Sequence, residues 1–218
     1  MSVLKVQGVC KTLRGSSVLS DINFELEGGT VTGIIGENGS GKSMLFRVLS
    51  GLVEPTEGCV LYNGESLRKA SPIIGLVMDD VSMYPELTGK KNLELLAEIR
   101  HQAGSKEIEE AIRRVGLDPD DKRAFRKYSL GMKHRLVLAQ AIMEKPDYLF
   151  LDEPTNAVDA EGVQIFYKII KEEAKRGTVV LVSSHVNSDI KELAEEVFQM
   201  ERGRLRAVST FEHLPPMV

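Results

Sequence analysis

The sequence has too few cysteines for a disulfide scaffold or a zinc site. Only Cys10 and Cys59 occur in 218 residues, and they are far apart, whereas such sites need several cysteines at characteristic spacings. A low cysteine content is typical of proteins in a reducing cytosol. We expect both thiols to be small residues of the core.

Long apolar runs are also missing. Runs such as 148–151 and 178–182 have the length of strands, far below the ~18 residues that a membrane-spanning helix needs. The first residues, Met-Ser-Val-Leu-Lys-Val, lack the cationic start, apolar run and cleavage site of a signal peptide. We therefore expect a cytoplasmic protein whose membrane contacts, if any, come through another chain.

The sequence has no excess of basic residues either. Lysine and arginine number 28 against 32 acidic residues, which gives a net charge of −4. Such a chain lacks the basic field that grips nucleic acid through its phosphates, so no nucleic-acid partner is expected. The hydrophobic content of 42% and charged content of 28% are those of an ordinary globular protein.

A phosphate-binding loop is the most specific motif present. Residues 36–43 read Gly-Glu-Asn-Gly-Ser-Gly-Lys-Ser, with a strand pattern over 31–35 before them and a helix pattern over 44–49 after them. A glycine-rich turn before an ordinary helix would not require lysine and serine in register. The loop's backbone N–H groups, the lysine ammonium and the serine hydroxyl suit a nucleotide and its Mg²⁺. The residues expected to contact the nucleotide here are Gly36, Glu37, Asn38, Gly39, Ser40, Gly41, Lys42, Ser43 and Met44.

Strand and helix patterns alternate around this loop, with a helical stretch inserted from about 80 to 145. Alternation of this kind predicts an α/β fold with a mostly parallel sheet covered on both faces and a ligand site at the carboxyl ends of the strands. The expected strands are 3–9, 18–27, 31–35, 59–62, 73–78, 148–151 and 178–182, with a hairpin turn at Asn63-Gly64 and a helix at 161–175.

Two acids follow the apolar run Tyr148-Leu-Phe-Leu151. As the end of a buried strand, this segment would deliver Asp152 and Glu153 beside the phosphate-binding loop. We expect Asp152 to hold the Mg²⁺ shell and Glu153 to orient and polarise the attacking water. Two solvated acids ahead of a proline are the alternative, and the loop upstream favours the catalytic pair.

Together with Tyr128-Ser-Leu-Gly-Met132, these motifs resemble those of the ATP-binding cassette family. The family signature is Leu-Ser-Gly-Gly-Gln, and Ser129 and Gly131 match its second and fourth positions, whereas Tyr128, Leu130 and Met132 do not. The resemblance implies that the serine hydroxyl and nearby backbone amides contact the γ-phosphate of ATP held by a partner subunit.

The resemblance extends over essentially the whole chain. Asn156-Ala-Val-Asp159 matches the D-loop, so Asp159 is expected at the nucleotide interface, and His185 matches the switch histidine that reaches the γ-phosphate. The implied catalytic residues are Lys42, Glu153 and His185. The implied fold is a P-loop NTPase with a RecA-like core and an antiparallel β subdomain. It forms a single domain over 1–218, with 1–78 and 146–218 as core and about 79–145 as a helical subdomain.

Two positions depart from the family pattern. Asp79 stands where a glutamine usually joins the core to the helical insertion. Its carboxylate can ligate Mg²⁺ but cannot donate a hydrogen bond as an amide does. Leu13 stands where an aromatic side chain usually stacks on adenine, and offers only apolar contact.

The resemblance implies an ATP- and Mg²⁺-dependent ATPase subunit of a transporter. Two cassettes, identical or different, would dimerise head to tail and bind a separate membrane permease on the inner face of the membrane, through the groove beside Asp79 and residues 84–88. The Tyr-Ser-Leu-Gly-Met form of the signature is similar to that of bacterial exporters of drugs, antibiotics or peptides.

Other functions remain as alternatives. A non-transport ATP-binding cassette protein acting on ribosomes or DNA usually carries two cassettes or a long coiled coil, and neither fits this chain. Asp79 and Leu13 would allow a nucleotide sensor with little hydrolysis, and the retained Lys42, Asp152, Glu153 and His185 argue against it. A nucleotide kinase would not explain Ser129, Gly131 and His185 together. We expect the other histidines, His101, His134 and His213, at the surface.

Overall fold

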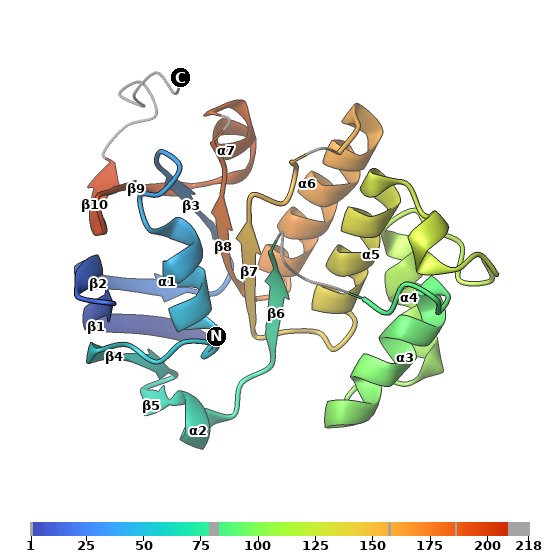
Figure 1. Ribbon diagram of the computed structural model, residues 1–218, viewed down its shortest axis with the longest axis horizontal. Helices are drawn as coiled ribbons and strands as arrows, with labels where there is room; N and C mark the ends of the chain where they lie inside the picture. Colours follow the sequence, from blue (N-terminus) through green and yellow to red (C-terminus); the bar gives the residue numbers. More distant parts are fainter. Residues whose placement is uncertain (1, 79–82, 157, 186, 209–218) are drawn as a thin grey trace.

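The chain forms two sheets and a group of helices (Figure 1), seen in a computed structural model that describes residues 2–78, 83–156, 158–185 and 187–208. A four-stranded antiparallel sheet has the order β2-β1-β4-β5. Its strands are β1 (Val3–Leu13), β2 (Ser16–Glu27), β4 (Glu57–Tyr62) and β5 (Glu65–Ser66).

The second sheet has six strands in the order β10-β9-β3-β8-β7-β6 and is parallel except for the β9–β10 pair. Every residue of β3, β7 and β8 is buried, which explains why these strands are mostly apolar and do not alternate with exposed polar residues. The mostly parallel sheet predicted from the sequence is confirmed. Its strands are β3 (Val31–Ile35), β6 (Ile74–Val77), β7 (Tyr148–Asp152), β8 (Val179–Ser183), β9 (Glu196–Glu201) and β10 (Arg204–Val208).

Side-chain caps begin three of the helices. Thr88 accepts a hydrogen bond from the Lys91 backbone, and Ser129 and Asp159 cap their helices in the same way. The helices are α1 (Lys42–Leu49), α2 (Leu67–Ala70), α3 (Gly89–Arg100), α4 (Ser105–Arg114), α5 (Leu130–Ile142), α6 (Ala160–Lys175) and α7 (Asn187–Leu193), with a 3₁₀ turn at Phe125–Lys127.

Two hydrophobic clusters lie on either side of the parallel sheet. One joins α1 and the antiparallel sheet to side chains such as Phe150 and Leu181. The other joins α3, α4 and α5 to α6, α7 and side chains such as Leu149 and Val180. Neighbouring residues of a strand point to opposite faces, so β7 and β8 supply both clusters. The helical insertion, on the right in Figure 1, therefore shares its core with α6 and α7.

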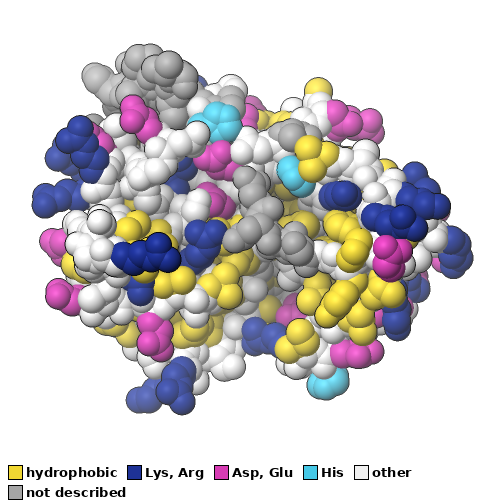
Figure 2. All heavy atoms as spheres, viewed as in Figure 1, with side chains coloured by type: hydrophobic (Ala, Val, Ile, Leu, Met, Phe, Trp, Pro, Cys, Tyr) yellow, Lys and Arg dark blue, Asp and Glu magenta, His cyan; other side chains and the backbone are white. Residues whose placement is uncertain are grey.

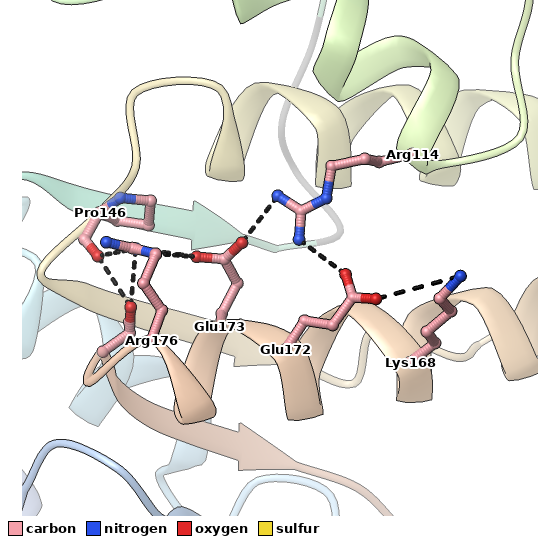
Figure 3. A network of polar contacts seen from close by, with 7 residues as sticks. Arg114, Pro146, Lys168, Glu172, Glu173 and Arg176 are labelled. Atoms are coloured by element: carbon pink, nitrogen blue, oxygen red, sulfur yellow. Dashed lines mark hydrogen bonds and ion pairs between the residues drawn. The ribbon is translucent and has the colours of Figure 1, made fainter.

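An ion-pair network also ties the insertion to α6 (Figure 3). Arg114 on α4 reaches Glu173, which is 2% exposed, and Glu172. Arg176 binds the other oxygen of Glu173 and the carbonyl of Pro146 before β7. The network holds the end of α4 against the layer that carries β7.

The sequence missed three strands and misplaced both cysteines. It predicted none of β5, β9 and β10. Cys59 is exposed and Cys10 only partly buried, so the expectation that both lie in the core was wrong. Cys59 pairs with the exposed Gln7 across β1 and β4, and residues opposite each other in a sheet share a face.

Candidate functional site

The phosphate-binding loop connects β3 to α1 and lies against β9. Gly39 and Gly41 have φ of +79° and +114°, which side chains other than glycine rarely adopt. A Cβ at Gly36 would lie 2.3 Å from the carbonyl oxygen of Met200. The hydroxyl of Ser40 is buried in this loop and has no hydrogen-bond partner among the described residues. It is available to a bound group.

The side chain of Lys42 lies against the backbone of the loop, and the residue is 5% exposed. Its ammonium donates to the carbonyls of Gly36 (2.7 Å) and Glu37 (3.2 Å) and lies 3.4 Å from Oε1 of Glu153. Oxygen acceptors thus surround the positive charge of Lys42. The phosphate oxygens of a bound nucleotide would take the place of these acceptors.

The acids at the end of β7 lie beside the end of β8. Ser183 Oγ donates to Asp152 Oδ1 (2.6 Å), and the backbone N–H of Glu153 donates to Ser183 Oγ (3.0 Å). Glu153 has φ of +49°, an uncommon conformation for a non-glycine residue that neighbouring contacts must hold in place.

The carboxylate of Glu153 is the centre of the site. Its Oε2 accepts from Asn156 Nδ2 (2.7 Å) and lies 2.9 Å from Nδ1 of His185, opposite the oxygen that faces Lys42. Burial favours a raised pKa, but the hydrogen bonds from Asn156 and His185 and the charge of Lys42 together lower the pKa of Glu153. The carboxylate is therefore ionised at neutral pH.

The other residues predicted to bind the nucleotide differ in how exposed they are. Ser43 is partly buried in the first turn of α1, and Met44 packs against the core beside the antiparallel sheet. Glu37, Asn38 and Gly39 are exposed. Leu13 is 42% exposed at the end of β1. Asp79 lies outside the described residues.

Signature and D-loop residues serve as helix caps. Ser129 is exposed and accepts from the Met132 N–H at the start of α5. A Cβ at Gly131 would meet no described atom within 4 Å. Asp159 accepts from the Gly162 N–H at the start of α6. Among the described residues, neither Ser129 nor Asp159 makes a hydrogen bond or ion pair with Lys42, Glu153 or His185.

Tyr128, which departs from the signature, is a packing residue. It is 7% exposed, stacks near Phe125 and lies under the guanidinium of Arg123. A Cβ at Gly89 would lie 2.8 Å from its hydroxyl. The tyrosine therefore anchors the loop before α5 to the start of α3 and leaves Ser129 facing solvent.

His134 was expected at the surface without a partner, and the structure places it at the edge of the site. It is partly buried and lines a cavity of about 190 Å³ with Asp152, Glu153 and apolar side chains such as Met78. The signal available in the sequence was the position of His134 in α5, one helical turn after Leu130. His101 is exposed as expected, and His213 lies outside the described residues.

The oxygen groups at this edge fit a Mg²⁺–nucleotide complex. Ser43 lies in the first turn of α1 and Asp152 ends β7, and hydroxyl and carboxylate oxygens are ligands that Mg²⁺ accepts. The described part of the chain holds no cluster of three or more histidine, cysteine or acidic side chains suited to a metal.

Comparison with known proteins points to one family. A family model described as ABC transporter matches residues 19–156. YybJ of Bacillus subtilis, an uncharacterized ABC transporter ATP-binding protein, is 41% identical over 93% of this chain and 94% of its own length. The bacitracin transport ATP-binding protein BcrA of Enterococcus faecalis is 34% identical over 93% and 68%. The lantibiotic transport ATP-binding protein SrtF of Streptococcus pyogenes is 32% identical over 93% and 89%.

A solved structure shares the fold. A dimeric ATP-binding cassette bound to ADP and Pi in a post-hydrolysis state has a TM-score of 0.85. It is 23% identical, with 94% of this chain and 97% of that one covered. The fold predicted from the sequence, a P-loop NTPase with an antiparallel sheet and a helical insertion, is confirmed.

Proposed function

This chain belongs to the ABC transporter family as an ATP-binding ATPase subunit, and on that premise we propose that two copies clasp MgATP to power export through a separate membrane permease. The observation that carries the proposal is the convergence of Lys42, Glu153 and His185 at one edge of the parallel sheet. These side chains come from α1 and from the segments that follow β7 and β8, so the fold itself assembles them.

Lys42 and the loop would bind the phosphates. The ammonium exchanges its carbonyl and carboxylate partners for β- and γ-phosphate oxygens, while the N–H groups at the start of α1 and the Ser40 hydroxyl face the same charge. When the ammonium of Lys42 moves from Glu153 to the phosphates, Oε1 of Glu153 loses its partner. That oxygen then accepts a proton from the attacking water.

Glu153 would act as the base and His185 as the contact to the γ-phosphate. The lowered pKa of Glu153 keeps its carboxylate ionised, so it polarises water by charge and orientation. His185 is half exposed and touches the same carboxylate, so its ring lies beside the base, from where it would contact the γ-phosphate.

Ser43 and Asp152 would hold Mg²⁺, and Asp79 would add a third oxygen ligand. The ion neutralises charge on the β- and γ-phosphates when it is bound. Ser183 orients Asp152 through a 2.6 Å hydrogen bond, which fixes the carboxylate before a ligand arrives.

A second cassette would complete the site. Ser129 and Gly131 are open to solvent at the start of α5, where backbone N–H groups favour an anion. Asp159 and Leu13 would face the interface and adenine respectively. One copy supplies the loop and the acids, and the other supplies the signature serine.

The names of the relatives support export. BcrA and SrtF are named for transport of bacitracin and lantibiotic, so the proposed cargo is an antibiotic-like peptide. No helix in the described part of the chain is long and apolar enough to cross a membrane. Exposed Tyr84 and Ile99 lie on the helical subdomain, where hydrophobic and basic side chains alternate on the surface (Figure 2), and we propose this region as the permease contact.

The test is nucleotide-dependent dimerisation with the water attack blocked. With Glu153→Gln, ATP and Mg²⁺ should convert the protein to a dimer in light scattering, while wild type cycles and hydrolyses ATP. Lys42→Ala is the matched control and should stay monomeric. A Glu153→Gln protein that remains monomeric with saturating MgATP, alone and with its co-purifying membrane protein, would contradict the proposal.

A further inference from the structure

Asp189 on α7 is a buried carboxylate that no family motif discussed above includes. It is 8% exposed. Its Oδ2 accepts from Thr155 Oγ1 (2.6 Å) and Ser184 Oγ (3.3 Å), and its Oδ1 accepts from the Tyr167 hydroxyl (2.7 Å). In the described part of the chain, no lysine or arginine forms an ion pair with it. Neutral hydroxyls therefore supply its hydrogen bonds.

The hydroxyl donors join three separate segments. Thr155 lies two residues after Glu153, and Ser184 directly precedes His185. Tyr167 belongs to α6, which packs beside α7. A single side chain thus connects the loop that carries the proposed base to the loop that carries the proposed switch histidine.

The physical chemistry makes this connection specific. A buried carboxylate without an ion pair is costly unless hydrogen bonds satisfy it, so each hydroxyl is drawn to a defined position. Glu153, at φ +49°, needs such restraint because its backbone conformation is unfavourable on its own. Asn156 and Ser183 restrain Glu153 locally, whereas Asp189 restrains the two loops relative to each other.

We infer that Asp189 is a positioning residue that holds the Glu153 and His185 loops in register through Thr155 and Ser184. The inference rests on the proposed function, because that proposal assigns the roles of Glu153 and His185. A purely structural alternative is that Asp189 only fastens α7 to α6 through Tyr167. The two explanations differ in which hydroxyl matters for turnover.

The first experiment measures ATP turnover and ATP binding separately. Asp189→Ala should lower kcat by roughly 10- to 100-fold, the scale expected for loss of catalytic alignment, with the ATP dissociation constant unchanged. Asp189→Asn keeps the side-chain size and one acceptor oxygen, so its loss should be smaller. Thr155→Val and Ser184→Ala should each lower kcat more than Tyr167→Phe. Glu173→Gln, at a buried acid outside the site, controls for general destabilisation.

The second experiment does not depend on hydrolysis. The ring ¹⁵N resonances of His185 in the nucleotide-free protein report its 2.9 Å contact with Glu153, and a His185→Gln spectrum assigns them. Asp189→Asn and Asp189→Ala should shift these resonances, whereas Glu173→Gln should not.

The outcomes separate the inference from the proposed function. If Asp189→Asn and Asp189→Ala lower the melting temperature but leave kcat and the His185 resonances as in wild type, Asp189 only stabilises the fold and the inference fails. If wild type shows no turnover that Glu153→Gln removes, the proposed function fails. The His185 resonances still decide whether Asp189 sets the geometry.

Discussion

Arg114 on α4 and Glu173 on α6 form an ion pair of 2.8 Å, and the carboxylate in it is 3% exposed at its side chain. Glu173 is bound on its other oxygen by Arg176, so it has a cation on each side (Figure 3). The pair joins the helical insertion to the catalytic layer through a buried carboxylate, and Arg114 itself is partly exposed. The ion pairs of Glu173 thus connect these two parts of the chain directly.

Removing Glu173 should therefore destabilise the whole fold. Glu173→Ala leaves Arg114 and Arg176 without their shared partner. Because these two side chains are 29% and 40% exposed, water can solvate them, and the expected loss is about 1.5–3 kcal/mol, the range for hydrogen bonds to a charged group. Lys168→Ala is the matched control on the same helix, because its 4.0 Å pair with Glu172 is largely exposed and should contribute less than about 0.5 kcal/mol. Urea unfolding of both variants measures the difference. Equal midpoints would show that the network adds no stability.

The hydrogen bond from Asn156 should lower the pKa of Glu153. The shift from the ordinary value of 4.5 is downward, so this group stabilises the folded protein above pH 4.5 and the contribution is lost as pH falls through the lowered pKa. Lys42, His185 and Asp152 are the charged or titratable groups around it. Asn156→Ala should move the pKa of Glu153 upward.

Carboxyl ¹³C NMR of the nucleotide-free protein follows this titration directly. Asn23→Ala, at an exposed asparagine on β2, is the control and should leave the Glu153 titration unchanged. An unshifted titration in Asn156→Ala would mean that His185 and Lys42 alone set the pKa.

Two glycines of the site should respond in opposite ways to alanine. Gly36→Ala places a Cβ 2.3 Å from the Met200 carbonyl and should destabilise the fold by about 1–3 kcal/mol through overpacking. Gly131→Ala meets open space at the start of α5, so stability should be retained or improved, because alanine favours helix by about 1 kcal/mol.

Hydrolysis provides the second half of this comparison. Gly131→Ala should still lose ATPase activity and MgATP-dependent dimerisation, since the added methyl occupies the surface that faces the partner's nucleotide. Thermal unfolding and turnover, measured on the same preparations, separate the effects. Full activity in Gly131→Ala would place the partner's phosphate elsewhere.

An aromatic residue at position 13 should strengthen ATP binding. Leu13 is 42% exposed, and Leu13→Tyr would add a ring able to stack on adenine, worth about 1 kcal/mol or roughly fivefold in the dissociation constant. Leu52→Tyr adds the same ring at a leucine that is 65% exposed. It should leave ATP affinity unchanged in calorimetry. Equal effects of the two substitutions would show that position 13 does not face the base.

Much of the fold was predictable because its strongest signals are local. The buried strands β7 and β8 carry apolar runs of four residues, and Thr88 and Asn63-Gly64 show ordinary cap and turn chemistry. Strand β9, by contrast, is only partly buried. Its mixed sequence, and that of β10, lacks a clear alternation, so their pairing depends on the sheet that is already formed.

The site was predictable only where motifs mark it. The sequence singled out Lys42, Glu153 and His185, and the structure brings these side chains together; their catalytic roles stay predictions. The contacts of Asp189 with Thr155 and Tyr167 depend on chain segments that meet only after folding. No pattern of spacing indicates that a residue of α7 binds hydroxyls from three segments.

The shared core of α3–α7 has a consequence for engineering. Transplanting residues 79–145 from a relative would confront foreign side chains with α6 and α7, so a working chimaera must exchange the facing residues of those helices as well. The helical insertion, which would contact the permease, shares this core with the layer that holds the catalytic acids. The sequences of the two parts therefore have to change together.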